Sequence, residues 1–139
     1  MNIAILAANE RIDTRNFRSG VAMTKPFKAG NTGELADGEM EEVILNGLEL
    51  MLARAGDNYY ITDNRCTHLG GKLSQGTLKG NVVTCPLHGS QFDIRDGSVV
   101  RWIHEPPGTP SFTGKLRGSP RAITTYRVAV KDGQITVYL

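Results

Sequence analysis

The chain has 139 residues, of which 40% are hydrophobic and 22% charged, and its formal net charge is only +2. This length suffices for one ordinary hydrophobic core, so we expect a single domain with no room for a separate catalytic domain. Nucleic-acid binding is a poor explanation, because the aromatic content is 6% and no basic helix or stacking pattern is present.

Residues 1–22 lie outside the pattern of the remaining chain, and we interpret them as an N-terminal extension of unknown role before a single domain at 23–139. The apolar run at 3–8 is too short for a secretory signal, and no basic segment precedes it. No apolar run approaches the roughly 20 residues that span a bilayer. We therefore expect no membrane association.

Short strands separated by turn signals follow in the domain. Asn46-Gly47 between two apolar runs is a strong hairpin signal, and Asp132-Gly133 marks a second hairpin near the C-terminus. Strands are predicted at 43–45, 48–52, 59–62, 73–78, 82–84, 91–94, 98–103, 125–130 and 134–138. Turn signals recur about every 8 to 12 residues, which is typical of an all-β antiparallel sandwich or barrel.

Two segments have unusual composition. Residues 31–50 contain six acidic residues and no lysine or arginine, which we interpret as a solvated face. Residues 104–120 contain four prolines and three glycines, so regular structure is improbable there. His104 stands alone before these prolines and is interpreted as a surface or packing histidine. Phe92 and Trp102 are expected in the core.

The residues able to carry chemistry are concentrated in two short stretches. Cys66 and His68 form a Cys-x-His turn, and Cys85 and His88 form a Cys-x-x-His turn after sixteen intervening residues. Thiolate and imidazole suit zinc or iron-sulfur chemistry. In structural zinc sites one turn usually supplies two cysteines and the other two histidines, whereas each turn here supplies one of each. A two-iron cluster could take both cysteines on one iron and both histidines on the other. A zinc site, a simple disulfide and unrelated buried thiols remain the alternatives.

The stretches Cys66-Thr67-His68-Leu69-Gly70-Gly71 and Cys85-Pro86-Leu87-His88-Gly89-Ser90 resemble the two cluster-binding boxes of Rieske-type [2Fe-2S] ferredoxins, and the resemblance runs from about residue 28 to 139. It implies a Rieske-type β-fold with a cluster-binding subdomain of two hairpin loops at about 64–93. It also implies a [2Fe-2S] cluster held by Cys66, His68, Cys85 and His88, with the added electron on the histidine-bound iron. By the same resemblance, the proline-bearing segment 106–110 should pack beside the cluster.

One departure divides that family. Respiratory-type Rieske proteins carry an additional disulfide between the boxes, and the matching positions here are Gly71 and Leu87. The chain therefore resembles the disulfide-free branch, which fits a reducing cytoplasm. Ser90 is expected to donate a hydrogen bond to a bridging sulfide, but Phe92 stands where high-potential relatives have tyrosine. We therefore predict a potential toward the lower end of the roughly −150 to +300 mV Rieske range.

The resemblance implies a one-electron carrier that is not itself an enzyme and that passes electrons from a reductase to a terminal oxygenase or related redox enzyme. An accessory subunit of a multi-component enzyme, such as a nitrite reductase, is the alternative, followed by a redox-inert, zinc-stabilised binding module. Residues 101–127 hold five basic residues against Glu105 alone. We expect this charge to steer a redox partner, which would make electron transfer depend on ionic strength.

Overall fold

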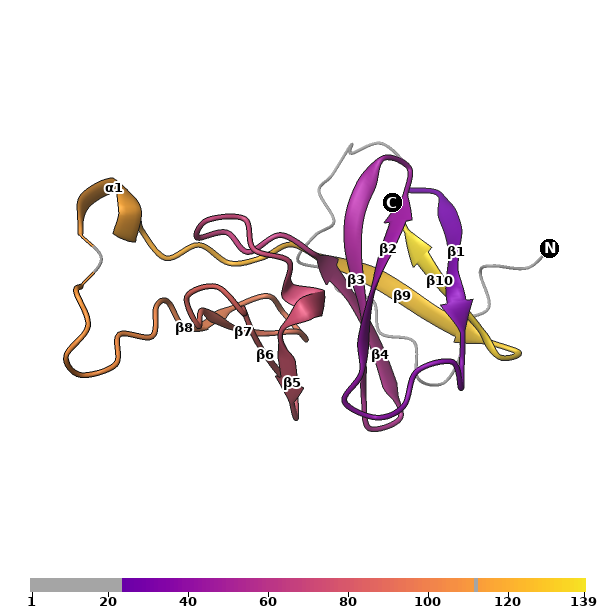
Figure 1. Ribbon diagram of the computed structural model, residues 1–139. Helices are drawn as coiled ribbons and strands as arrows, with labels where there is room; N and C mark the ends of the chain where they lie inside the picture. The colour runs from indigo at the N-terminus through magenta and orange to yellow at the C-terminus, as the bar shows by residue number, and fades with distance from the viewer. Residues whose placement is uncertain (1–23, 112) are drawn as a thin grey trace.

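A computed structural model describes residues 24–111 and 113–139 (Figure 1). The predicted extension at residues 1–22 lies outside the described residues. The fold is all-β, as the turn spacing predicts, and consists of a six-stranded sheet and a four-stranded sheet. Within the described ranges, no helix is long and apolar enough to cross a membrane.

The larger sheet is antiparallel throughout and has the strand order β1-β10-β9-β4-β3-β2. Its strands are β1 (Pro26–Asn31), β2 (Met40–Leu45), β3 (Leu48–Ala55), β4 (Asn58–Asp63), β9 (Thr125–Lys131) and β10 (Gln134–Tyr138). The sheet curls so that its two edges approach each other. The evidence is that a Cβ added at Gly30 in β1 would contact the side chain of Leu52 in β3. Both predicted hairpin turns are confirmed, with positive φ at Asn46-Gly47 and at Asp132-Gly133.

Strand β1 is not predicted from the sequence. Pro26 and Gly30 interrupt its pattern, and it pairs only with β10, with a bulge between Lys28 and Gly30. Lys25 and Leu139 extend the pairing of β1 with β10, because the amide of each donates to the carbonyl of the other, at 2.7 and 2.9 Å. The two ends of the described chain are thus joined on the larger sheet.

The smaller sheet carries the second ligand stretch and has the order β5-β6-β7-β8. Its strands are β5 (Thr77–Lys79), β6 (Val82–Thr84), β7 (Gln91–Asp93) and β8 (Val99–Arg101). In Figure 1 it stands beside the larger sheet, with the segment that bears the one-turn helix α1 (Gly114–Arg117) beyond it. Apart from α1, residues 104–111 and 113–120 have no regular structure, as predicted.

Strand β3 joins the two units because it is buried on both faces. Leu50 and Leu52 belong to the core inside the larger sheet, whereas Met51 and Ala53 belong to a second core under the smaller sheet. The second core includes both cysteines and the predicted core residues Phe92 and Trp102. The site is therefore part of the packed interior that β3 shares.

The strand predicted over 73–78, with a break at Gly76, is confirmed only after the break. The chain forms a 3-10 turn at Leu73–Gln75 and only then enters β5. The amide of Ser74 donates to the side-chain oxygen of Asn64 at 2.8 Å, which bends the chain. Gly76 then passes so close to Thr84 that a Cβ there would lie 1.9 Å from its carbonyl oxygen. The strands predicted at 91–94 and 98–103 exist but are shorter, as β7 and β8.

Candidate metal centre

The two ligand stretches form loops with the same backbone hydrogen bonds. In the first loop, the Cys66 amide donates to the Gly71 carbonyl at 2.8 Å, and the Gly70 amide donates to the Cys66 carbonyl at 2.9 Å. In the second, the Cys85 amide donates to Ser90 at 2.8 Å, and Gly89 donates to Cys85 at 3.2 Å. Each loop thus presents its cysteine at the same place, although the histidine follows after one residue in one loop and two in the other.

The two cysteines meet in the interior. Both are buried and neither forms a disulfide. The Cys85 thiol donates a hydrogen bond to the sulfur of Cys66, which lowers the pKa of Cys66 and raises the pKa of Cys85. The two sulfurs therefore lie side by side, as two thiolate ligands of one metal atom must.

The loops approach most closely at Gly71. A Cβ at this position would lie 2.8 Å from the Cys85 sulfur and 2.9 Å from two carbons of Leu87. Positions 71 and 87 therefore face each other, where the respiratory-type relatives carry their additional disulfide. With glycine and leucine here, the loops are held by packing and hydrogen bonds.

The two imidazoles form a second pair, half-buried and separate from the thiols. The rings of His68 and His88 have centroids 5.0 Å apart at an interplanar angle of 79°. The Trp102 ring lies edge-on to His68 at 5.2 Å. Among the residues that the structure describes, no three Cys, His, Asp or Glu side chains converge on one ion. A thiol pair beside an imidazole pair fits a group with two metal atoms.

A buried polar residue ties the first loop to the larger sheet. Asn64 is fully buried, and its side-chain amide donates to Glu42 at 3.0 Å while its oxygen accepts from Ser74 at 2.8 Å. Its backbone amide donates to the Glu49 carbonyl at 3.0 Å. Every polar group of Asn64 is thus used to fix the chain two residues before Cys66.

An arginine completes this tie. Arg65 makes a two-pronged ion pair with Glu49, at 2.9 and 3.0 Å, and also donates to the Gly70 carbonyl at 3.0 Å. The hydrogen bond from Arg65 lowers the pKa of Glu49 below its usual value. Hydrogen bonds from Lys72 and then Asn64 likewise lower the pKa of Glu42. These carboxylates are charged anchors of the first loop.

Most of the acidic segment is a solvated face, as predicted, because Glu34, Asp37, Glu39 and Glu41 are exposed. Its carboxylates also accept hydrogen bonds. Besides Glu42 and Glu49, the carboxylates of Glu34, Asp37 and Glu39 accept backbone hydrogen bonds of 2.6 to 2.7 Å. Neither Asn64 nor the acidic anchors of the loop were identified from the sequence. The available signal was the pair Asn64-Arg65 directly before Cys66, two polar residues at the end of an apolar strand.

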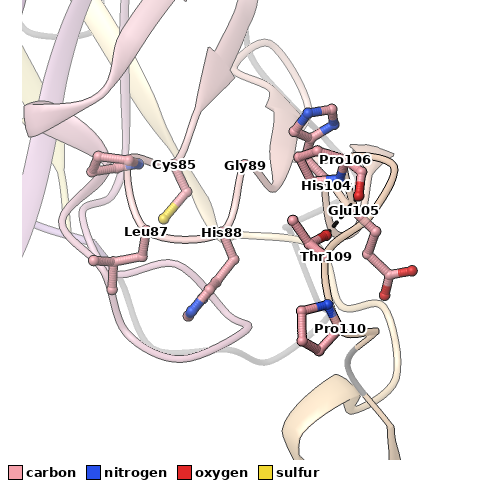
Figure 2. Close-up of a pocket in the computed structure, with 10 residues that line it drawn as sticks. Cys85, Leu87, His88, Gly89, His104, Glu105, Pro106, Thr109 and Pro110 are labelled. Atoms are coloured by element: carbon pink, nitrogen blue, oxygen red, sulfur yellow. Dashed lines mark hydrogen bonds between the residues drawn. The ribbon is translucent and has the colours of Figure 1, made fainter.

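The second loop is held by residues that follow it in the chain. Arg101 donates to the Gly89 carbonyl at 2.9 and 3.1 Å, and the His104 amide donates to the His88 carbonyl at 2.9 Å. Gly89 has a positive φ of 73°, and a Cβ there would lie 2.6 Å from the Cβ of His104. His104 is exposed, as predicted, and its side chain points away from His88 in Figure 2.

Ser90 lies in the packed interior of the site. Its fully buried hydroxyl donates to the backbone carbonyl of Trp102, and its hydrogen bond to a bridging sulfide stays a prediction. Ser90 directly precedes β7 and Trp102 directly follows β8, and the pairing of Gln91 with Arg101 brings these two residues together.

The proline-bearing segment faces the second loop, and its packing beside the cluster stays a prediction. A groove of about 430 Å³ separates the two. Figure 2 shows the His88 ring and Leu87 on one side of this groove and Thr109 and Pro110 on the other. The structure pairs the predicted ligands two by two, Cys66 with Cys85 and His68 with His88.

Comparison with known proteins identifies the family. The model of the Rieske [2Fe-2S] domain matches residues 25–135. The ferredoxin component of the naphthalene 1,2-dioxygenase/salicylate 5-hydroxylase systems of a Ralstonia species is 36% identical over 98 residues, covering 70% of this chain and 86% of that protein. The chain therefore belongs to the Rieske [2Fe-2S] domain family, and the [2Fe-2S] cluster is its cofactor.

Solved structures agree with this assignment. A chain in the complex of reduced oxygenase and oxidised ferredoxin of carbazole 1,9a-dioxygenase has a TM-score of 0.64 and 28% identity, over 80% of this chain and 99% of that one. A nitrite reductase small subunit from Mycobacterium tuberculosis has a TM-score of 0.65 over 85% of this chain and 97% of that one. Its identity is 21%, so it shows the fold alone.

Replacing Asn64 by alanine should destabilise the protein by about 2 kcal/mol, because the amide of Ser74 and the carboxylate of Glu42 lose a buried partner. The measurement is the free energy of unfolding by urea, under reducing and anaerobic conditions. Asn58 is exposed and serves as the matched control, since its replacement by alanine should change stability by less than about 0.5 kcal/mol. Equal effects of the two substitutions would contradict the role assigned to Asn64.

Proposed function

We propose that the protein is a Rieske ferredoxin, a one-electron carrier that passes electrons from a reductase to a terminal oxygenase or a related redox enzyme. The observation that carries this proposal is the pairing of donors. Two buried thiols lie in hydrogen-bond contact, and two imidazoles lie with ring centroids 5.0 Å apart. In Rieske ligation the cysteines bind one iron and the histidines bind the other.

We assign Cys66, His68, Cys85 and His88 as the ligands. The bound cluster supplies reversible one-electron chemistry. The residues of the chain hold it, exclude water and set its surroundings. The thiols belong to the second core, and Phe92 and Ile94 shield them there. The closing hydrogen bonds of the loops fix the cysteine backbones before any metal binds.

The relatives support the carrier role and the kind of partner. The Ralstonia relative is named a ferredoxin component of oxygenase systems, and the carbazole dioxygenase structure is a complex of a ferredoxin with its oxygenase. We therefore propose redox proteins as partners on both sides of the transfer. A reducing cytoplasm is the compartment we propose, because both cysteines are free and no disulfide secures the loops.

The accessory-subunit alternative has less support. The nitrite reductase small subunit resembles this chain in fold only. The complete set of two cysteines and two histidines favours an active carrier over a subunit with a purely structural role. The zinc-stabilised module is the third reading, and metal analysis separates it from the first two.

Low-temperature electron paramagnetic resonance of the dithionite-reduced protein tests the ligand assignment. We expect a rhombic spectrum with the low average g value of a histidine-ligated cluster, and about two irons and two sulfides per chain. Replacing His68 or His88 by alanine should abolish this spectrum, whereas His104→Ala should leave it intact. A silent sample containing one zinc, or a His88→Ala variant that keeps the signal, would remove the basis of the proposal.

A redox titration tests the environment of the cluster. The expected midpoint lies in the lower half of the roughly −150 to +300 mV Rieske range, because Phe92 offers no hydroxyl and the inter-loop disulfide is missing. A midpoint above about +200 mV would show that the chain does not belong to the low-potential branch.

A further inference from the structure

The imidazole of His68 is held by a backbone carbonyl from far along the chain. Its Nε2 donates a hydrogen bond to the carbonyl of Leu116 at 2.5 Å. Because a carbonyl only accepts hydrogen bonds, Nε2 carries the proton in this contact. A neutral imidazole with its proton on Nε2 keeps its lone pair on Nδ1, and the Nδ1 of His68 is buried. The contact therefore selects the tautomer in which Nδ1 can bind a metal.

The ring of Trp102 repeats this arrangement at the next carbonyl. Its Nε1 donates to the carbonyl of Arg117 at 2.7 Å, and the ring lies edge-on to His68 with the centroids 5.2 Å apart. Two rings in contact with each other thus donate to two successive carbonyls. Together these contacts fix the position of the His68 imidazole and the direction of its N–H bond.

Both carbonyls belong to the C-terminal end of α1, where a helix has no partners of its own for its carbonyls. The amide of Gly118 donates to the carbonyl of Gly114 at 3.1 Å and closes the single turn of α1. The chain then leaves the helix at Gly118 with a φ of 62°, a conformation that favours glycine. The short helix therefore presents the carbonyls of Leu116 and Arg117 to the two rings.

Contacts on both sides of these carbonyls hold α1 against the site. Thr67 donates from its hydroxyl to the carbonyl of Arg121 at 2.6 Å, and the guanidinium of Arg121 donates back to the Thr67 carbonyl at 2.8 Å. The side chain of Arg117 pairs with Glu105 at 2.8 Å. The side chain of Leu116 is 60% exposed, so the backbone of this residue, and not its side chain, makes the contact with the site.

We propose that α1 is a positioning element of the cluster site, in which the Leu116 carbonyl holds the His68 imidazole with its proton on Nε2 and leaves Nδ1 as the nitrogen for iron. This inference rests on the proposed carrier function. A hydrogen bond from the outer N–H of a metal-bound imidazole to a carbonyl fixes the ring and makes it a stronger donor to the metal. A stronger donor stabilises the oxidised state, so the contact lowers the reduction potential.

Two substitutions outside the ligands weaken this contact in different ways. Trp102→Phe keeps an aromatic ring beside His68 but removes the donor that holds the Arg117 carbonyl. Gly118→Ala changes no ring and lies at an exposed position, but it strains the turn that ends α1 because of the positive φ. Gly80→Ala is the matched control, since Gly80 is also exposed and has a φ of 58°, in the turn between β5 and β6.

The readouts are the midpoint potential and the nitrogen hyperfine couplings of the two histidine ligands, measured by pulsed electron paramagnetic resonance of the reduced protein. Trp102→Phe and Gly118→Ala should each shift the reduction equilibrium about threefold toward the reduced state, a rise of ~30 mV for a one-electron couple. Each should also change the coupling of one histidine only, because the carbonyl contacts His68. Gly80→Ala should change neither quantity.

Unchanged or lowered potentials in both variants would overturn the positioning role, and so would an equal change in Gly80→Ala. A rise in potential with altered couplings of both histidines would show a general loosening of the site and would overturn it as well. A parent protein that lacks the spectrum of a histidine-ligated cluster would instead remove the carrier function itself.

Discussion

The site depends on how each ligand loop is closed. In both loops the cysteine amide donates to a carbonyl five residues ahead and the cysteine carbonyl accepts from an amide four residues ahead, so two unlike sequences form the same loop. This closure requires residues without side chains. Gly70 and Gly89 adopt positive φ, and Gly71 leaves the space that the Cys85 sulfur occupies. The loops can therefore face each other closely enough to bring the two thiols into contact.

The position of these loops depends in turn on β3. Its residues are buried alternately in the core of the larger sheet and in the core under the smaller one. Asn64 and Arg65 add polar ties from the first loop to Glu42 of β2 and Glu49 of β3. Packing fixes the distance between the two units, and the hydrogen bonds fix the direction of the loop. Together they supply the rigid support that a site with four ligands needs.

Much of this organisation could be predicted from the sequence because its signals are local. The spacing of Cys66, His68, Cys85 and His88 and the turns at Asn46-Gly47 and Asp132-Gly133 each depend on neighbouring residues. The failures involve distant partners. The bend at Leu73–Gln75 depends on the side chain of Asn64, and β1 forms only because β10 supplies a partner. The hydrogen bond from His68 to Leu116 is made to a backbone carbonyl, which every residue possesses, so no residue pattern could reveal it.

The backbone pairing of Lys25 with Leu139 has a practical consequence. It lies on the larger sheet, whereas the ligand loops and α1 lie at the opposite side of the molecule in Figure 1. A surface or a fused domain attached after Leu139 would hold the protein by the end far from the ligand loops. Immobilisation on an electrode through Leu139 would therefore turn the ligand loops toward solution. Direct exchange of electrons between the electrode and the cluster would require attachment near the ligand loops.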